Sequence, residues 1–226
     1  MSDEQELQNF FSRVAGGYEK CAVEKIGYIA HERLPQRLLQ LKQTQAKANS
    51  EADGNTTPLR VLDLACGTGL CSKAFFAAGC EVTGVDFAPG MIAVASQLPF
   101  TELLCQSIEE DLPLPDSSFD LVIAVGVTEF IKLPAAMFRR IQQKLKVGGL
   151  CGITLPKPSD NDQELGIISF DLSDYLKFIN MDQFEILEVE EFYGWESGHL
   201  SELEGLSKPR YRIDYNALYL RKKDQS

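Results

Sequence analysis

The sequence has few basic residues relative to its acidic ones. Its 226 residues include 22 lysines and arginines against 33 aspartates and glutamates, which gives a formal net charge of -11. This balance argues against a polyanionic partner bound through a broad basic surface. The dense basic cluster Arg221-Lys222-Lys223 stands at the C-terminus. We therefore expect no nucleic-acid partner.

Cysteine pairs and long apolar runs are also missing. None of the 6 cysteines belongs to a Cys-x-x-Cys pair, so we expect reduced thiols, a cytoplasmic protein and no metal site. No run approaches the length of a transmembrane helix. The acidic N-terminus lacks the apolar stretch of a signal peptide. We expect one domain that acts away from membranes, as a monomer or a homodimer.

Residues 60–86 carry the strongest local pattern in the chain. The apolar run Val61-Leu-Asp-Leu64 predicts a buried parallel strand, and a glycine turn, a helix and a second strand follow it. Gly67 and Gly69 remove Cβ atoms where a ligand must approach the backbone closely. Asp86 ends the second strand, where its carboxylate can accept hydrogen bonds from the ribose of an adenosine. The segment is therefore half of a nucleotide-binding α/β unit.

The loop departs from the dinucleotide fingerprint. A third glycine would stand at position 72 or 70, and the chain has Ser72 and Leu70 there. Asp63 also stands where a pyrophosphate would be repelled. A cationic or zwitterionic ligand suits this loop better.

The stretch Asp63-Leu-Ala-Cys-Gly-Thr-Gly69 resembles the loop of class I methyltransferases that binds S-adenosyl-L-methionine (AdoMet). A closer likeness is to the small methyltransferase-like proteins of the Williams–Beuren-region family. It rests on the segment from Tyr18 to Tyr28, Ala65–Leu70, Gly84–Met91, Val125-Gly126 and Trp195-Glu196. The resemblance implies a Rossmann-like α/β fold. Its seven-stranded mixed sheet would have the order 3-2-1-4-5-7-6, with helices on both faces and an N-terminal helical cap. AdoMet would be the cofactor and S-adenosyl-L-homocysteine the product.

The resemblance also implies which residues contact AdoMet. Ser107 stands where the family commonly has an aspartate that accepts from the adenine amino group, and the backbone N–H of Ile108 would face the ring. The full set is Tyr18, Tyr28, Asp63, Ala65, Gly67, Gly69, Asp86, Phe87, Met91, Ser107, Ile108, Val125 and Gly126.

We expect four parts within the single domain. Residues 1–45 would form the cap, 46–58 a linker, 59–155 the AdoMet-binding core and 156–226 a substrate-side part. Pro35 fits the first turn of a second cap helix. Gly148-Gly149 would close a helix that starts at Pro134, before a strand at Leu150–Leu155.

Methyl transfer from AdoMet is an in-line displacement that rests on proximity, alignment and a desolvated site. A neutral acceptor needs a base, for which Glu129 is the first candidate. His31 and His199 are the only histidines and are further candidates. Tyr193 and Trp195 would line the acceptor pocket or serve loop packing.

Three functions fit the sequence. The first is O- or N-methylation of a small molecule without a metal. The second is methylation of a protein, since an acidic surface suits a basic peptide. The third is an AdoMet-binding scaffold or enzyme that transfers no methyl group, for example one that assists a cyclisation.

Overall fold

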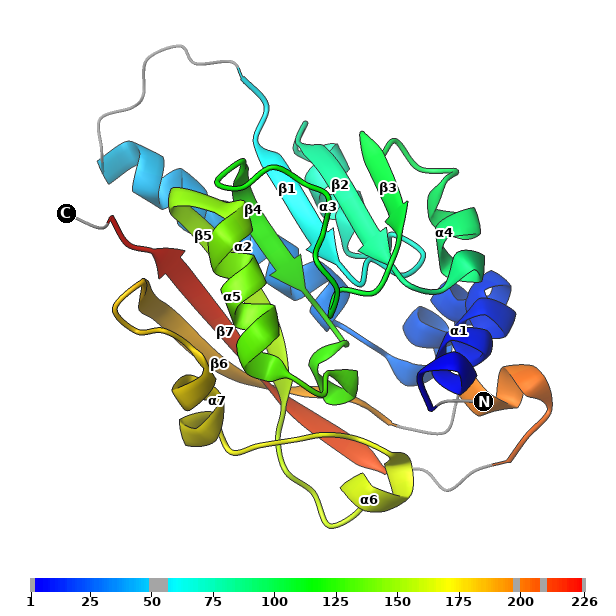
Figure 1. Ribbon diagram of the computed structural model, residues 1–226. Helices are drawn as coiled ribbons and strands as arrows, with labels where there is room; N and C mark the ends of the chain where they lie inside the picture. The colour runs from blue at the N-terminus through cyan, green and yellow to red at the C-terminus, as the bar shows by residue number, and fades with distance from the viewer. Residues whose placement is uncertain (1–2, 49–56, 197–199, 208–210, 225–226) are drawn as a thin grey trace.

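The computed structural model describes residues 3–48, 57–196, 200–207 and 211–224, and of residues 3 and 193–196 it describes the backbone alone. Seven strands form one sheet in the order β3-β2-β1-β4-β5-β7-β6 (Figure 1), which confirms the predicted order. Strands β1 to β5 pair in parallel, and β7 is antiparallel to β5 and β6. The strands are β1 Arg60–Leu64, β2 Glu81–Asp86, β3 Glu102–Cys105, β4 Phe119–Ala124, β5 Leu145–Pro156, β6 Phe184–Glu196 and β7 Arg212–Lys222.

Helices cover both faces of this sheet (Figure 1). The α-helices are α1 Asp3–Lys20, α2 Ala30–Ala48, α3 Ser72–Ala77, α4 Pro89–Ala95, α5 Pro134–Lys144, α6 Asp162–Leu165 and α7 Leu172–Phe178. A π-helix, η1 Cys21–Ile26, follows α1, and two 3-10 helices lie at η2 Thr128–Phe130 and η3 Leu200–Glu204. Among the helices of the described ranges, none has the length and apolar character needed to cross a membrane.

Strand β4 shows how the core is divided. Successive side chains of a strand point to opposite faces. Leu121 and Ile123 pack with the α2 and α3 side chains, whereas Val122 and Ala124 pack with those of α5 and α7. A strand buried on both faces needs a continuous apolar run, which is the pattern from which the strand was predicted.

The predicted cap divides into two different parts. Helix α1 packs on α4 at the edge of the sheet, whereas α2 covers a sheet face through Leu34 and Leu38. Pro35 lies inside α2, so its prediction as a first-turn residue is wrong. Because proline has no N–H, the carbonyl of His31 lacks the usual i+4 donor. The helix also runs through residues 46–48, which were predicted as the start of the linker.

Gly148-Gly149 does not close a helix. Helix α5 ends at Lys144 and strand β5 begins at Leu145, so both glycines lie within β5. A Cβ at Gly149 would stand 2.8 Å from the Lys146 carbonyl oxygen and 3.2 Å from that of Asp120. Glycine is required there because β5 is irregular where its register with β4 shifts, which brings the backbone of both strands against this position.

Helix α1 is docked on α4 through Gly90. A Cβ at Gly90 would lie 2.3 Å from the carbonyl oxygen of Ser12 and 2.6 Å from its Cα. The Gln8 side chain also donates to the Phe87 carbonyl oxygen at 2.7 Å. Since Phe87 directly follows Asp86, this contact holds α1 beside the end of β2.

Gly90→Ala is expected to lower the free energy of unfolding by about 1–3 kcal/mol, because the added methyl group meets backbone that cannot move alone. Gly16→Ala is the matched control, since no atom lies within 4 Å of its Cβ position. Within helix α1 that change should be neutral or stabilise by up to about 1 kcal/mol. Urea unfolding measures both, and equal effects would contradict the close packing of α1.

Candidate active site

A cavity of about 560 Å³ opens at the carboxyl edge of the parallel strands, between the sheet and α1. Ligands of open α/β sheets bind at this edge, where the strand order reverses. We call it the large cavity. The predicted cofactor residues on its wall are Tyr18, Ala65, Gly67, Asp86, Phe87, Met91, Ser107, Ile108, Val125 and Gly126.

Asp86 organises the glycine loop at this cavity. Its carboxylate accepts hydrogen bonds from the backbone N–H groups of Gly67 at 2.9 Å and Ala88 at 2.8 Å. Burial raises the pKa of Asp86, and the two amides oppose that rise. Gly67 has a φ of +56° and no atom within 4 Å of its Cβ position. The backbone next to Asp86 is therefore open to a ligand.

Of the predicted cofactor residues, Tyr28 lines a second, smaller cavity, and Asp63 and Gly69 line neither. Asp63 is 1% exposed and accepts a hydrogen bond from the Ser72 hydroxyl at 2.6 Å. Burial raises the pKa of Asp63 to about 7. Gly69 has a φ of +87°, and its Cβ would lie 2.6 Å from the Leu98 side chain. Both residues shape the loop from behind its ligand-facing side.

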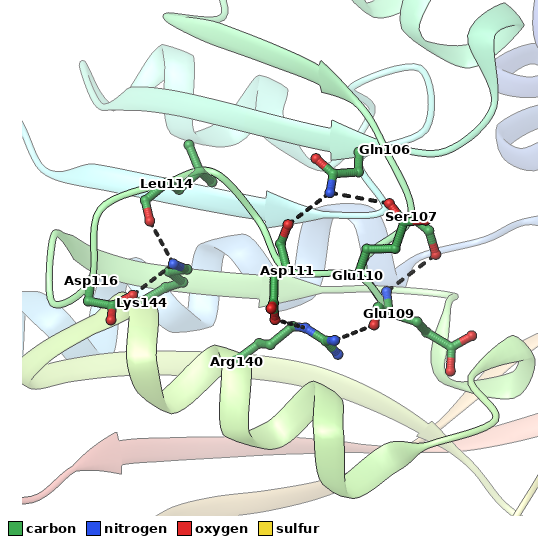
Figure 2. Close-up of polar contacts among 9 residues, drawn as sticks. All are labelled: Gln106, Ser107, Glu109, Glu110, Asp111, Leu114, Asp116, Arg140 and Lys144. Atoms are coloured by element: carbon green, nitrogen blue, oxygen red, sulfur yellow. Dashed lines mark hydrogen bonds and ion pairs between the residues drawn. The ribbon is translucent and has the colours of Figure 1, made fainter.

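The loop between β3 and β4 is clamped by α5 (Figure 2). Arg140 donates to the Glu109 carbonyl oxygen. One turn further on, Lys144 donates to the Leu114 carbonyl oxygen at 2.6 Å and to the Asp116 carboxylate at 2.7 Å. The amphipathic sequence pattern of α5 did not predict this clamp. Such a pattern identifies the apolar face of a helix but not the partners of its long basic side chains.

Ser107 and Ile108 stand at the start of this clamped loop and on the wall of the large cavity. The Ser107 hydroxyl accepts a hydrogen bond from the Glu109 N–H at 3.3 Å. Ile108 is buried. The clamp therefore sets the position of both residues that were predicted to face the adenine.

A second cavity of about 30 Å³, which we call the inner cavity, adjoins the large one. The two share the wall residues Phe11, Tyr18, Gly126 and Phe130. The Tyr28 hydroxyl lies 3.1 Å from the Cβ position of Gly126. The remaining wall residues are Ala22, Ile26, Tyr28, Glu129 and Leu200. Two of them belong to the π-helix η1, and π-helical turns are frequent at functional sites.

Glu129 brings a buried carboxylate to the inner cavity and is 1% exposed. Its Oε1 atom accepts a hydrogen bond from the Tyr215 hydroxyl at 2.6 Å. Its Oε2 atom is buried and has no hydrogen-bond partner among the described residues. Burial raises the pKa of Glu129, and the Tyr215 hydroxyl and the backbone N–H of Glu129 itself oppose the rise. The carboxyl group thus has one oxygen left for a ligand.

The other two candidate bases are placed differently. His31 is 7% exposed and lines neither cavity. Its ring stacks on Tyr28, with the centroids 5.9 Å apart, and burial lowers its pKa. His199 lies outside the described residues, as do the side chains of Tyr193 and Trp195.

Several wall residues had no predicted role. Phe11 and Phe130 line both cavities, and their rings meet edge to face with centroids 5.7 Å apart. Leu165, Gly166 and Ile168 line the large cavity from the segment after β5. The rule that ligands bind beyond the carboxyl ends of parallel strands could have identified Phe130 and this segment. No local signal distinguishes Phe11 from core residues of an amphipathic helix.

Comparison with known proteins identifies the core. Residues 62–153 match the family model described as a methyltransferase domain. That match covers 92 of the 226 residues. The chain is 31% identical over 137 residues to the malonyl-[acyl-carrier protein] O-methyltransferase of Serratia marcescens, across 60% of this chain and 47% of that protein. The chain spans less than half the length of the curated relatives that it matches.

Solved structures share the fold of this chain. An S-adenosylmethionine dependent methyltransferase from Mesorhizobium loti superposes with a TM-score of 0.56 at 22% identity, over 77% of this chain and 96% of that one. The [4+2]-cyclase SpnF superposes with a TM-score of 0.57 at 21% identity, over 80% and 81%. At these identities the likeness establishes the fold, which a methyltransferase and a cyclase share.

Proposed function

We propose that the protein transfers the methyl group of AdoMet to a small acceptor molecule. The observation that carries this proposal is the Asp86 carboxylate. It lies on the wall of the large cavity, held by the Gly67 and Ala88 amides at the end of β2. In a methyltransferase domain this position suits the ribose hydroxyls of AdoMet.

The residues on the wall of the large cavity fit AdoMet in chemistry. The open backbone at Gly67 and the neighbouring wall residue Ala65 would hold the methionine part. The side chains of Phe87 and Met91, with Ser107 and Ile108, would enclose the adenine. The Tyr18 ring would face the sulfonium through cation–π attraction. When bound, AdoMet supplies an electrophilic methyl group. Asp63 would affect AdoMet binding only by shaping the glycine loop, since its side chain lies behind that loop.

Glu129 is the proposed general base, because its carboxylate lies in the inner cavity beside Gly126 and Tyr28. His31 is separated from that cavity by Tyr28 and would act only through it. The closer likeness to the Williams–Beuren-region proteins, the cytoplasmic location, the four-part division and the oligomeric state stay predictions.

The test is formation of S-adenosylhomocysteine from AdoMet in the presence of small-molecule pools and, separately, peptide pools. We expect a small-molecule pool to yield S-adenosylhomocysteine in equal amount to a product 14 Da heavier than its precursor, a mass difference of about one methylene group. Yield from peptides alone would favour a protein methyltransferase. Tight AdoMet binding without product from any pool would instead indicate a protein that binds AdoMet and transfers no methyl group.

A further inference from the structure

A buried carboxylate, that of Glu129, lines the inner cavity. Glu129 has a buried Oε2 atom without a partner, next to a cavity with walls of aromatic and aliphatic side chains. A buried carboxylate is costly unless it is paired and hydrogen-bonded. Tyr215 satisfies one oxygen and leaves the other for a ligand that enters from the large cavity.

We propose that the inner cavity is the acceptor subsite and that it selects a primary or secondary amine, whose cation pairs with the Glu129 carboxylate. This inference rests on the proposed methyltransferase function and narrows its acceptor to one chemical class. An amine cation supplies both the positive charge and the N–H donor that Oε2 lacks.

The charges around the cavity support a cation. No lysine, arginine or histidine is among the inner-cavity wall residues of the described chain. On the large cavity, Lys132 is the basic wall residue within the same described ranges, and its side chain is exposed. A carboxylate or phosphate acceptor would therefore face Glu129 with no basic side chain to compensate, which is unfavourable in a buried site.

The aromatic walls of the inner cavity also favour a cationic acceptor. Phe11, Tyr18, Tyr28 and Phe130 surround the inner cavity. The faces of aromatic rings attract cations, more strongly where water is excluded. Burial raises the pKa of Glu129. Its carboxylate is therefore a stronger base toward a bound ammonium group.

The volume limits what enters. The inner cavity, at about 30 Å³, is far smaller than the large cavity, at about 560 Å³, so the amine head group enters and the rest of the acceptor remains in the large cavity. A quaternary ammonium group is disfavoured, because it has no N–H to donate to the Oε2 atom. Leu165 and Ile168 give the large cavity an apolar wall for an alkyl chain.

With an amine in the inner cavity, proton removal precedes methyl transfer. Glu129 takes one proton from the ammonium group, which frees the nitrogen lone pair. The nitrogen then attacks the methyl carbon, the N–C bond forms, and the S–C bond breaks with its electron pair going to sulfur. The products are S-adenosylhomocysteine and a methylated ammonium ion. The proton on Glu129 passes to solvent when the product leaves.

The experiment titrates the S-adenosylhomocysteine complex with n-propylamine, n-propanol, propionate and trimethylpropylammonium by saturation-transfer difference NMR. We expect the amine to bind at least about tenfold more tightly than each of the others, since hydrogen bonds between charged partners are the strong ones. Equal binding of n-propanol, or preferred binding of propionate or the quaternary ion, would overturn the amine assignment.

Glu129→Gln should reduce the affinity for n-propylamine by about tenfold or more and leave n-propanol nearly unchanged. The glutamine retains an oxygen that accepts from Tyr215. Glu102→Gln is the matched control, because Glu102 is exposed on β3 and lines neither cavity. It should bind the amine like the unchanged protein. The selectivity of the unchanged protein tests the proposal even if Glu129→Gln does not fold.

A turnover assay separates the two proposals. With AdoMet, n-propylamine should yield S-adenosylhomocysteine and N-methylpropylamine. Selective amine binding without turnover of any acceptor would support the amine subsite and contradict the methyltransferase function. Methylation of n-propanol or propionate in preference to the amine would keep the function and overturn the subsite. A lysine-containing peptide methylated at its side-chain amine would support the chemical class and assign the acceptor to a protein.

Discussion

Asp86→Asn is expected to weaken AdoMet binding about 100-fold, which equals about 2.7 kcal/mol. The substitution removes the charge that accepts from the Gly67 and Ala88 amides. It also places an NH₂ group where one of those donors points. The ribose would lose a charge-assisted acceptor, and the glycine loop would lose its fixed position. Isothermal titration calorimetry with AdoMet and with S-adenosylhomocysteine measures the change.

Asp120→Asn is the matched control for that measurement. Asp120 also accepts from a backbone N–H, that of Arg60 at 2.9 Å, and it pairs with Lys146. It lines neither cavity, so its loss should change the AdoMet dissociation constant by less than about threefold. Unchanged AdoMet affinity in Asp86→Asn would disprove the ribose assignment. A comparable loss in both variants would assign the effect to stability.

Asp63→Asn is expected to stabilise the protein increasingly as the pH rises. Burial raises the pKa of Asp63 from 3.8 to about 7, so the folded protein holds this proton more tightly than the unfolded chain. The stabilising contribution of the proton is complete below the unfolded pKa and is lost as the pH rises to about 7. Asparagine has no such dependence. Its advantage should grow by about 4 kcal/mol between the two pKa values.

Urea unfolding of Asp63→Asn and the unchanged protein, at intervals from about pH 4 to about pH 8, tests this prediction. Ser72→Ala provides a second reading. It removes the hydrogen bond that lowers the Asp63 pKa, so the loss of stability should extend to higher pH. Parallel pH curves for the asparagine variant and the unchanged protein would show that Asp63 ionises alike in both states.

The central strands and the cofactor side of the site could be predicted from the sequence, because local residue patterns specify them. The apolar runs of β1 and β4 have the pattern of strands buried on both faces. Gly67 is needed for a positive φ, and Asp86 is recognisable as an acid at a strand end. Local patterns were also misleading where packing prevailed. Gly148-Gly149 resembles a helix stop, yet it serves the close approach of β5 to β4.

Tertiary structure alone decided which of these residues face a ligand. Asp63 and Asp86 both follow apolar strand positions, but Ser72 takes up the first carboxylate and the large cavity receives the second. Glu129 meets Tyr215 across 86 positions of sequence. The inner cavity combines α1, η1, the end of β4 and η3. Neighbouring residues fix the buried strands β1 and β4, the glycine loop and the acid of the cofactor site, so these follow from local sequence. The strand order was implied by the family resemblance. The acceptor side depends on contacts between distant segments, which leave no periodic pattern in the chain.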